Sequence, residues 1–523
     1  MVVSNNGIPP LSIADYSVSS FLFESDVSEG DQYLAMAMED TFVVADCEMF
    51  PFGEELIGHN LFEIIPFEEE QINDYEAESS LTVDDIFTPE GQLHDEMLPN
   101  EDILFSEQIP NFEGAQPIRI CAHGGFNHEV RQGEKKEEME LVQLLLASGR
   151  MIGDGKYDQA DRLVSKCKSL SRQLGSPTQR LAYYISGALQ DRIHRQTHGM
   201  LNNAAKPVSD FAFNIEGEFD QNELCSLVAY FTTVLPYTKL LQFTSVQAII
   251  DTVGDERKIH IIDLGMRSGS HWTVLMEYLA HRVVSSSFAA LELLRITAVG
   301  MNGQELKKSR RRLHELAKSL GIPFTYSIVE IPNIEEIKHG LFTVKSGEAL
   351  AVYSSFILRS LLYDPVVLAN LLIVINKLRP RIMVNVEVEA QHNSPCFVNR
   401  LSEVLFHYMA YFDLLDVTLT DRNDIKRLKH EELITGSQIR NMIVYEGKER
   451  SVRHVRSDVW RCLFKQAGFR EKSFSFQAMY QARLLLEEYA SGEYYTLKLD
   501  GHAIIVRWKG TPFFSLSAWT GTK

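Results

Sequence analysis

The sequence predicts a doubly wound α/β sheet that carries an α-helical cap and follows a disordered acidic arm. Three observations give this prediction. Apolar strand candidates alternate with helical runs over residues 258–523, residues 119–250 are mainly helical, and residues 1–118 contain acids but no Lys or Arg. At 523 residues the chain is long enough to bury a large core.

The formal net charge of −20 is distributed unevenly along the chain. Residues 1–118 hold 27 of the 71 Asp and Glu residues, and the first basic side chain is Arg119. The other 44 acids and all 51 bases lie in residues 119–523, which leaves that part with a net charge of +7. This asymmetry predicts an interaction tail on a folded body.

The acidic arm, residues 1–118, alternates acids with bulky apolar groups in segments such as FLFESDV and NLFEIIPFEEE. Acids without basic partners repel one another, which predicts disorder. Acidic–hydrophobic alternation is also typical of disordered activation segments. Two hypotheses follow: the arm binds a coactivator by ordering a few apolar residues, or it is a solubilising tail without a specific partner.

The chain is expected to be soluble and intracellular, without a membrane partner. No cysteine belongs to a C-x-x-C pair, so we expect neither a zinc site nor a disulfide framework, and a reducing compartment is indicated. The first residues do not resemble a secretory signal, and the longest apolar stretch, residues 366–375, is too short to span a bilayer.

Helical periodicity begins at residue 137 and continues to 170, with Gly153 and Gly155 dividing the run into two helices. Another helix is predicted over residues 179–195, and Pro236 is expected to start or kink a further one. This much helix before the first strand predicts a helical cap or bundle.

One of these helices carries an L-x-x-L-L pattern formed by Leu141, Leu144 and Leu145. Such a pattern can dock as an amphipathic helix in a partner's groove. The alternative is ordinary core packing, because any buried helix can produce the same spacing.

Six strands are predicted from apolar runs separated by helical stretches. They cover residues 259–264, 294–299, 324–329, 349–356, 381–389 and 441–446. Near-continuous apolar strands of this kind indicate a parallel sheet that is covered on both faces. Asp500-Gly501 then predicts an antiparallel hairpin, which is typical of the methyltransferase-like variety of the doubly wound fold.

A methyltransferase is therefore the first catalytic hypothesis. The turn after the first strand, residues 263–269, resembles an S-adenosylmethionine-binding turn, but its glycines are wrongly spaced, and Met266 and Arg267 add bulk. The second strand ends at residues 298–302 without the acid that would hold a ribose. We therefore expect no cofactor, and we expect Asp263 to cap the next helix or tie the turn together. A small-molecule methyltransferase or a ligand-gated relative is the alternative.

Other catalytic patterns are weak. Glu387, Glu389 and His392 could form an acid/base site, or they could make structural hydrogen bonds from one face of a strand. The sequence contains no G-x-S-x-G, H-E-x-x-H or Walker A motif. We therefore predict that the chain is not an enzyme.

Several ordered motifs resemble one family. A V-H-I-I-D motif is matched by Ile259, His260, Ile261, Ile262 and Asp263. An E-x-E-A-x-H-N motif is matched by residues 387–393, and an R-x-x-R-H run followed by W-R is matched between residues 450 and 461. A W-x(10)-W motif runs from Trp508 and ends in Ser517, Ala518 and Trp519.

With these motifs, residues 137 to 519 resemble the plant GRAS family of transcriptional regulators. The resemblance implies a nuclear regulator with a methyltransferase-like fold and a helical cap. It also implies homo- or heterodimers with other GRAS-like chains, and contacts with transcription factors or sequence-specific binding to DNA. The arm lacks the D-E-L-L-A motif, so we expect a member outside that subgroup.

Two basic stretches are candidates for DNA contact or nuclear import. Their residues are Lys307, Lys308, Arg310, Arg311, Arg312, Arg450, Arg453 and Arg456. The alternative is a plain solvated face. A net charge of +7 over residues 119–523 is small for a dedicated DNA-binding domain, so we expect DNA contact to be weak or supplied by a partner.

Leu306, Leu313 and Leu320 repeat every seven residues next to the first basic stretch. They are candidates for partner binding through a short coiled coil. The alternative is a core-packed amphipathic helix, because two heptads are few for a coiled coil.

Overall fold

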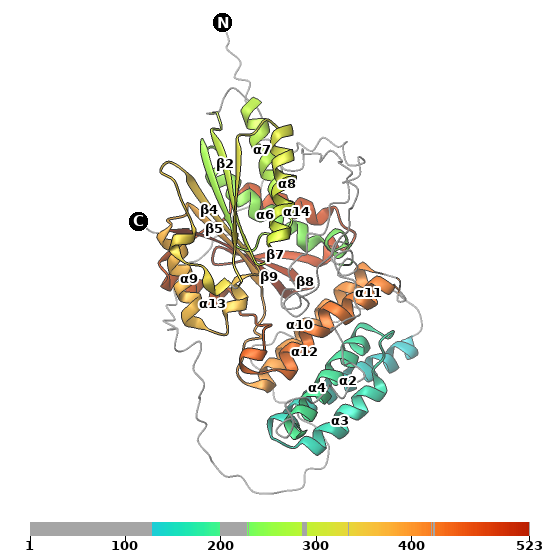
Figure 1. Ribbon diagram of the computed structural model, residues 1–523. Coiled ribbons are helices and arrows are strands. Elements are labelled where there is room, and N and C mark those ends of the chain that lie inside the picture. The colour runs from blue at the N-terminus through green and yellow to red at the C-terminus, as the bar shows by residue number, and fades with distance from the viewer. Residues whose placement is uncertain are drawn as a thin grey trace.

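The computed structural model describes residues 128–198, 227, 230–284, 290–332, 334–419, 421 and 424–521. The acidic arm, and the predictions of disorder and coactivator binding made for it, lie outside these residues. Within them the chain forms one sheet, helices on both faces of that sheet, and a separate layer of helices below it (Figure 1).

The sheet has the strand order β3-β2-β1-β4-β5-β9-β8-β7, and β6 pairs with β9. The parallel strands are β1 (Lys258–Asp263), β2 (Leu293–Gly300), β3 (Phe324–Glu330), β4 (Ala349–Ser355) and β5 (Ile382–Val388). The antiparallel strands are β6 (Phe469–Lys472), β7 (Tyr495–Asp500), β8 (Ala503–Trp508) and β9 (Thr511–Gly521). The order reverses between β1 and β4, so the sheet is doubly wound and methyltransferase-like, as predicted.

Both faces of the sheet are covered. The helices α6 (Pro236–Val253), α7 (His271–Val284), α8 (Gly303–Ser319) and α14 (Phe476–Glu487) lie on one side, and α9 (Pro365–Lys377) and α13 (Ser457–Gln466) lie on the other (Figure 1). Successive side chains of a strand point to opposite faces of the sheet, and β1 shows this. Ile261 packs into the cluster that contains α7 and α8, whereas Ile262 packs into the cluster that contains α9 and α13.

Five of the six predicted strands and the hairpin are confirmed, and Asp500 pairs with Ala503 across the turn. The strand predicted over residues 441–446 is wrong, because residues Ser437–Val444 form helix α12. The apolar run is buried in both interpretations, and burial alone does not separate a short strand from a helical segment. The helix continues directly from α11 (Ile425–His430) and a π-helical turn (Glu431–Gly436).

The cap contains α2 (His128–Gly153), α3 (Tyr157–Leu170) and α4 (Pro177–His198), so the predicted break at Gly153 and Gly155 is confirmed. It also contains α10 (Phe397–Thr418), α11 and α12 from the second half of the chain (Figure 1). Conversely, α6 packs on the sheet rather than in the cap. The predicted boundary between residues 250 and 258 therefore does not coincide with the boundary between the helical cap and the sheet with its covering helices.

A buried charge network joins the two halves of the cap. Arg180 Nε lies 3.0 Å from Glu431 Oε1, and Arg427 Nη1 lies 2.8 Å from the same oxygen. All three side chains are 0% exposed. Because removing one partner would leave a buried charge unpaired, this network fixes α4 against the π-helical turn.

The short 3-10 turns are η2 (Ile334–Glu336), η3 (His339–Leu341), η4 (Leu358–Leu361), η6 (Gly447–Glu449) and η7 (Gly492–Tyr494). Within the described part of the chain, every helix is too short or too polar to traverse a bilayer.

Candidate functional site

The glycine turn after β1 is held together by the carboxylate of Asp263. Its Oδ2 accepts a hydrogen bond from Trp272 Nε1 at 2.9 Å, and its Oδ1 accepts one from the Gly265 N–H at 3.1 Å. The Nε2 of His271 lies 3.4 Å from the same Oδ2. Asp263 is 1% exposed, so both oxygens are engaged inside the chain. The prediction that this residue ties the turn together is confirmed.

Met266 fills the middle of the turn. Its N–H donates to the carbonyl oxygen of Val299 at 2.9 Å, and its side chain is buried. Its Sδ lies 2.8 Å from the position that a Cβ on Gly269 would occupy. Gly269 has a φ of +67°, a conformation that favours glycine. This glycine therefore serves the packing of the chain itself rather than the approach of a ligand.

The end of the second strand is used in the same way. Asn302 caps α8, because its Oδ1 accepts hydrogen bonds from the N–H groups of Gln304 at 3.0 Å and Glu305 at 3.3 Å. Glu330, at the end of β3, accepts from the Gly303 N–H at 3.1 Å. The carboxylate at the end of β3 therefore binds the start of α8.

The residues present do not fit a bound S-adenosylmethionine. The side chains of Asp263, Asn302 and Glu330 already accept hydrogen bonds from groups of the chain itself. Among the described residues, no group of three or more His, Cys, Asp or Glu side chains could hold a metal ion. The outline of a nucleotide-binding turn is retained at the switch point between β1 and β4, and its interior is filled.

The three candidate acid/base residues at the end of β5 are also buried. Glu389 accepts hydrogen bonds from the N–H of Ser457 at 2.9 Å and from its Oγ at 3.0 Å, which fixes the start of α13. His392 Nδ1 lies 2.8 Å from His454 Nδ1. Burial raises the pKa of Glu387 to about 8, and the guanidinium of Arg359 opposes that rise. For Glu389 and His392, the hypothesis of structural hydrogen bonds is confirmed.

The second basic stretch does not form one surface. Arg450 donates to the carbonyl oxygen of His392 at 2.8 Å, and Arg453 donates to Asn393 Oδ1 at 2.7 Å. Both arginines are less than a tenth exposed, so their assignment as phosphate contacts is wrong. Burial, with the nearby charges of Arg400 and Arg453, lowers the pKa of Arg450 to about 9. Arg456 is exposed and lies 3.0 Å from Glu403.

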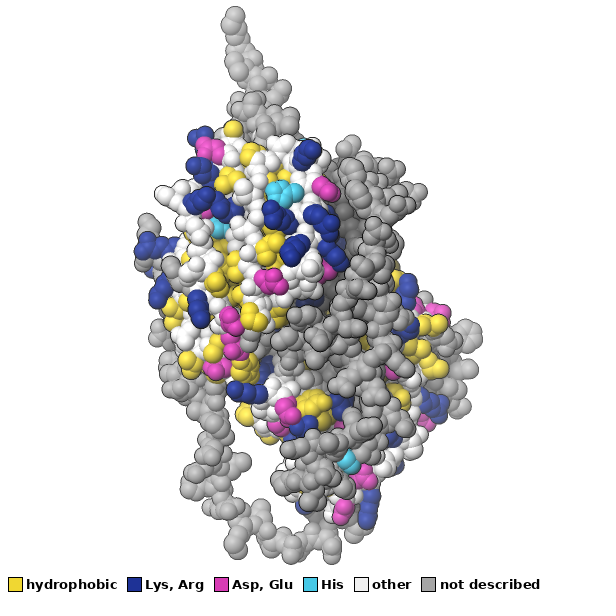
Figure 2. All heavy atoms as spheres, viewed as in Figure 1, with side chains coloured by type: hydrophobic (Ala, Val, Ile, Leu, Met, Phe, Trp, Pro, Cys, Tyr) yellow, Lys and Arg dark blue, Asp and Glu magenta, His cyan; other side chains and the backbone are white. Residues whose placement is uncertain are grey.

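The first basic stretch does form one surface, on α8. Lys307, Lys308, Arg310 and Arg311 are exposed, and Arg312 is half-buried. Figure 2 shows Lys and Arg side chains gathered over α8 in the upper part of the view. The helix as a whole carries six Lys and Arg residues and two Glu residues. Of the two predicted basic stretches, this one can present several positive charges to a partner at once.

The leucines of the same helix point inward. Leu306 and Leu313 are 0% exposed, and Leu320 packs partly buried against the same core cluster. Ser309, between them, hydrogen-bonds the hydroxyl of Tyr326 at 2.6 Å. The prediction that Leu306 and Leu313 bind a partner through a short coiled coil is therefore wrong. The alternative, a core-packed amphipathic helix, is confirmed.

The leucines of the L-x-x-L-L pattern also point into the core. Leu141 is 0% exposed, Leu145 is 1% exposed and Leu144 is 8% exposed, and all three belong to the hydrophobic core of the cap. Docking in a partner's groove would require α2 to leave that core. The interpretation as a surface motif is wrong, and ordinary packing is confirmed.

The family-motif residues have structural positions too. The motif in β1 is buried, and His260 Nε2 lies 2.8 Å from Thr297 Oγ1 on β2. In β9, Ser517 pairs with Asn385 of β5, and Ala518 and Trp519 are 1% exposed. Trp519 stacks on Phe464 of α13 at 4.6 Å between ring centroids. These residues build the sheet and its helical cover.

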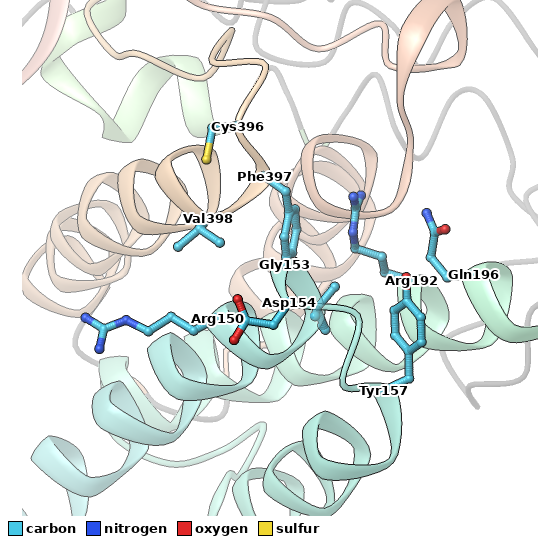
Figure 3. Close-up of a pocket in the computed structure, with 10 residues that line it drawn as sticks. Arg150, Gly153, Asp154, Tyr157, Arg192, Gln196, Cys396, Phe397 and Val398 are labelled. Atoms are coloured by element: carbon cyan, nitrogen blue, oxygen red, sulfur yellow. The ribbon is translucent and has the colours of Figure 1, made fainter. Parts of the chain in front are cut away.

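Two surface features had no signal in the sequence. A cavity of about 470 Å³ opens between the end of α2, the start of α3, α4 and the start of α10, and it is lined in part by Tyr157, Arg192 and Phe397 (Figure 3). On α14, Phe476 is 81% exposed and stacks on Tyr480 at 6.1 Å. The cavity depends on how distant helices pack, which periodicity does not determine, and the exposure of Phe476 depends on which elements cover α14.

The fold and the turn define the class: a methyltransferase-like α/β body with a helical cap, in which the side chains of the chain itself occupy the cofactor turn. The model of the GRAS domain family matches residues 141–520, and the chain belongs to this family. Its class of function is therefore that of the plant transcription regulators in this family.

Individual relatives agree with this assignment. Scarecrow-like protein 18 of Arabidopsis thaliana is 30% identical over 409 residues, which cover 72% of this chain and 91% of that protein. The DELLA protein RGL1 of the same species is 29% identical and covers 73% of this chain and 70% of its own length. The crystal structure of SCL7 from Oryza sativa superposes with a TM-score of 0.61 at 27% identity, covering 72% of this chain and 99% of SCL7. The prediction that the chain lies outside the DELLA subgroup stays a prediction.

Proposed function

We propose that the chain is a nuclear transcription regulator that acts through protein contacts with transcription factors or other GRAS-like chains, and that α8 adds a weak, salt-dependent contact with DNA phosphates. The observation that carries the DNA contact is the exposed basic face of α8, opposite its buried leucines. Arginine and lysine clusters on one surface are what phosphate binding needs.

The protein contacts are supported by the aromatic pair on α14. An exposed, stacked Phe476 and Tyr480 offers apolar area that is already ordered. Aromatic side chains of this kind are enriched at protein interfaces. Homo- or heterodimer formation belongs to the same proposal.

The DNA contact is tested by fluorescence anisotropy of the full chain with a mixed-sequence duplex over a range of salt concentrations. Neutralising two phosphate contacts with R310Q/R311Q should reduce the slope of log affinity against log salt by about 2, since each contact contributes about 0.9. R162Q/R172Q removes the same charge from exposed cap positions and should leave the slope unchanged. Equal slopes for the two variants, or no binding at low salt, would contradict direct DNA contact.

The acidic arm, as proposed, recruits a coactivator. Fusing residues 1–118 to a heterologous DNA-binding domain should activate a reporter gene, because the apolar anchors in the arm become available near a promoter. A fusion of the same length with Phe21 and Phe23 replaced by Ser keeps all 27 acids and should activate less. No activation by the native arm would leave solubilisation as its role.

A further inference from the structure

The exposed bases of α8 lie close together on one helix, and few of them have acidic partners. Several exposed arginines on other surfaces do pair with carboxylates: Arg195 with Glu449, Arg257 with Glu292, Arg381 with Glu256 and Arg456 with Glu403. Within the described residues, no ion pair engages Lys307, Arg310, Arg311 or Lys318. Lys308 is the exception, at 3.0 Å from Glu305.

Helical geometry collects these bases into one stripe. Positions 307, 311, 314 and 318 follow the i, i+4, i+7, i+11 spacing, so Lys307, Arg311, His314 and Lys318 lie along one line of the helix. Lys308 and Arg310 flank that line. The buried residues Leu306, Leu313 and Ala317 lie on the opposite side, so the stripe faces solvent. Next to its N-terminal end, Met301 is 41% exposed and offers an apolar contact.

The same chain holds a complementary segment. Residues 1–118 contain 27 acids and no base, interleaved with Phe, Leu and Ile. A segment tethered to the body has an effective concentration on the order of millimolar at a site within its reach. Extended, 118 residues reach several hundred ångströms at roughly 3.3 Å per residue, so distance does not restrict which surface the arm contacts.

We propose that the acidic arm, residues 1–118, docks on the basic stripe of α8 in the same molecule. Attraction between the arm's acids and Lys307, Arg310, Arg311 and Lys318 selects this helix, because it gathers four exposed bases that have no ion pair among the described residues. The contact is salt-sensitive because both partners are exposed to solvent. Its regulatory consequence rests on the proposed function of α8: a docked arm competes with DNA phosphates, and a coactivator that captures the arm would release the stripe.

The composition of the arm allows a direct test by zero-length carbodiimide crosslinking of the full chain. This reagent joins a carboxylate to an amine, and the arm has 27 carboxylates and no lysine. Every crosslink from an arm acid to a lysine therefore reports a lysine of the body. We expect these crosslinks to concentrate on Lys307, Lys308 and Lys318, rather than on the exposed lysines Lys166, Lys338 and Lys498. Raising the salt to about 1 M, where the screening length is about 3 Å, should remove most of them.

Two variants sharpen this test. R310E/R311E leaves all three reporter lysines of α8 in place and should reduce their crosslinks at least several-fold. R162E/R172E makes the same charge change at exposed positions of the cap and should leave them unchanged. An even spread of crosslinks over the body lysines, or equal yields in the two variants, would overturn the proposal.

Mixing isotopically heavy and light chains separates docking within one molecule from docking between two copies. Arm crosslinks confined to heavy–heavy and light–light pairs support the proposal, and heavy–light pairs at the statistical ratio overturn it. DNA is absent from these reactions. A chain whose α8 fails to bind DNA can therefore still show the contact, and a chain that binds DNA can still lack it.

Discussion

The glycine turn after β1 and the basic face of α8 are separated by little sequence, yet their polar groups are used in opposite ways. In the turn, Asp263 binds Trp272 and Gly265, and Met266 fills the remaining space. On α8, Lys307, Arg310 and Arg311 are exposed without an ion pair in the described structure. A turn that resembles a ligand site can be saturated by its own chain, whereas an ordinary amphipathic helix can carry the charges available to a partner.

The largest expected effect comes from the inside of the turn. Asp263→Ala would leave the buried indole N–H of Trp272 and the part-buried N–H of Gly265 without an acceptor. We expect the free energy of unfolding to fall by about 3 kcal/mol, measured by urea denaturation with tryptophan fluorescence. The exposed control Asp255→Ala should change it by less than about 0.5 kcal/mol. Equal effects would mean that the turn is as tolerant as a surface loop.

Gly269→Ala tests the filling of the turn by Met266. The substitution places a Cβ 2.8 Å from Met266 Sδ at a φ of +67°, so strain and crowding should together lower stability by about 2 kcal/mol. Gly347→Ala is the matched control, because its φ is +83° and no atom lies within 4 Å of the added Cβ. We expect about 1 kcal/mol there, from backbone strain alone. If the two glycines tolerate alanine equally, Met266 does not close the turn.

Glu387 gives a pH-dependent comparison. Burial raises its pKa to about 8 in the folded chain, against roughly 4.3 in the unfolded chain. The contribution of Glu387 to the free energy of unfolding is most favourable below its unfolded pKa, and it is lost as the pH rises through about 8. Between pH 5 and 8.5 the native chain should lose about 1–3 kcal/mol more stability than Glu387→Gln, which cannot ionise. Parallel stability profiles for the two proteins would show that the carboxyl is not held protonated.

The smallest expected effect on stability is at α8. R310E/R311E changes exposed side chains without ion pairs in the described structure, so its free energy of unfolding should stay within about 0.5 kcal/mol of the native value. The same variant should lose most of the salt-dependent affinity for DNA. A loss of stability comparable to that of Asp263→Ala would place these arginines in the packing of the fold rather than on a free surface.

The sequence predicted the parts of the fold that depend on local pattern. Alternating apolar runs predicted β1 to β5, the Asp500-Gly501 turn predicted the β7–β8 hairpin, and Gly153 and Gly155 divided α2 from α3. Residues 441–446 were mistaken for a strand because a short buried helix and a buried strand share the same apolar composition. The boundary of the cap was also missed, since α10 to α12 join α2 to α4 through contacts between distant parts of the chain.

The candidate site was predictable where helical spacing decides exposure and unpredictable where distant partners decide it. The heptad of Leu306 and Leu313 already indicated which side of α8 faces inward. By contrast, nothing near Arg450 in sequence reveals that it binds the carbonyl of His392. The same holds for Glu389, whose partner Ser457 lies on another element.

The proposed function places the chain's partner contacts on its outer surfaces, and the filled turn after β1 is expected to bind no cofactor. Calorimetric titration of the full chain with S-adenosylmethionine tests it most directly. The closed turn predicts no saturable heat, for the native chain and for Asp263→Asn alike. Tight, stoichiometric heat from the native chain that is lost in Asp263→Asn would contradict the account.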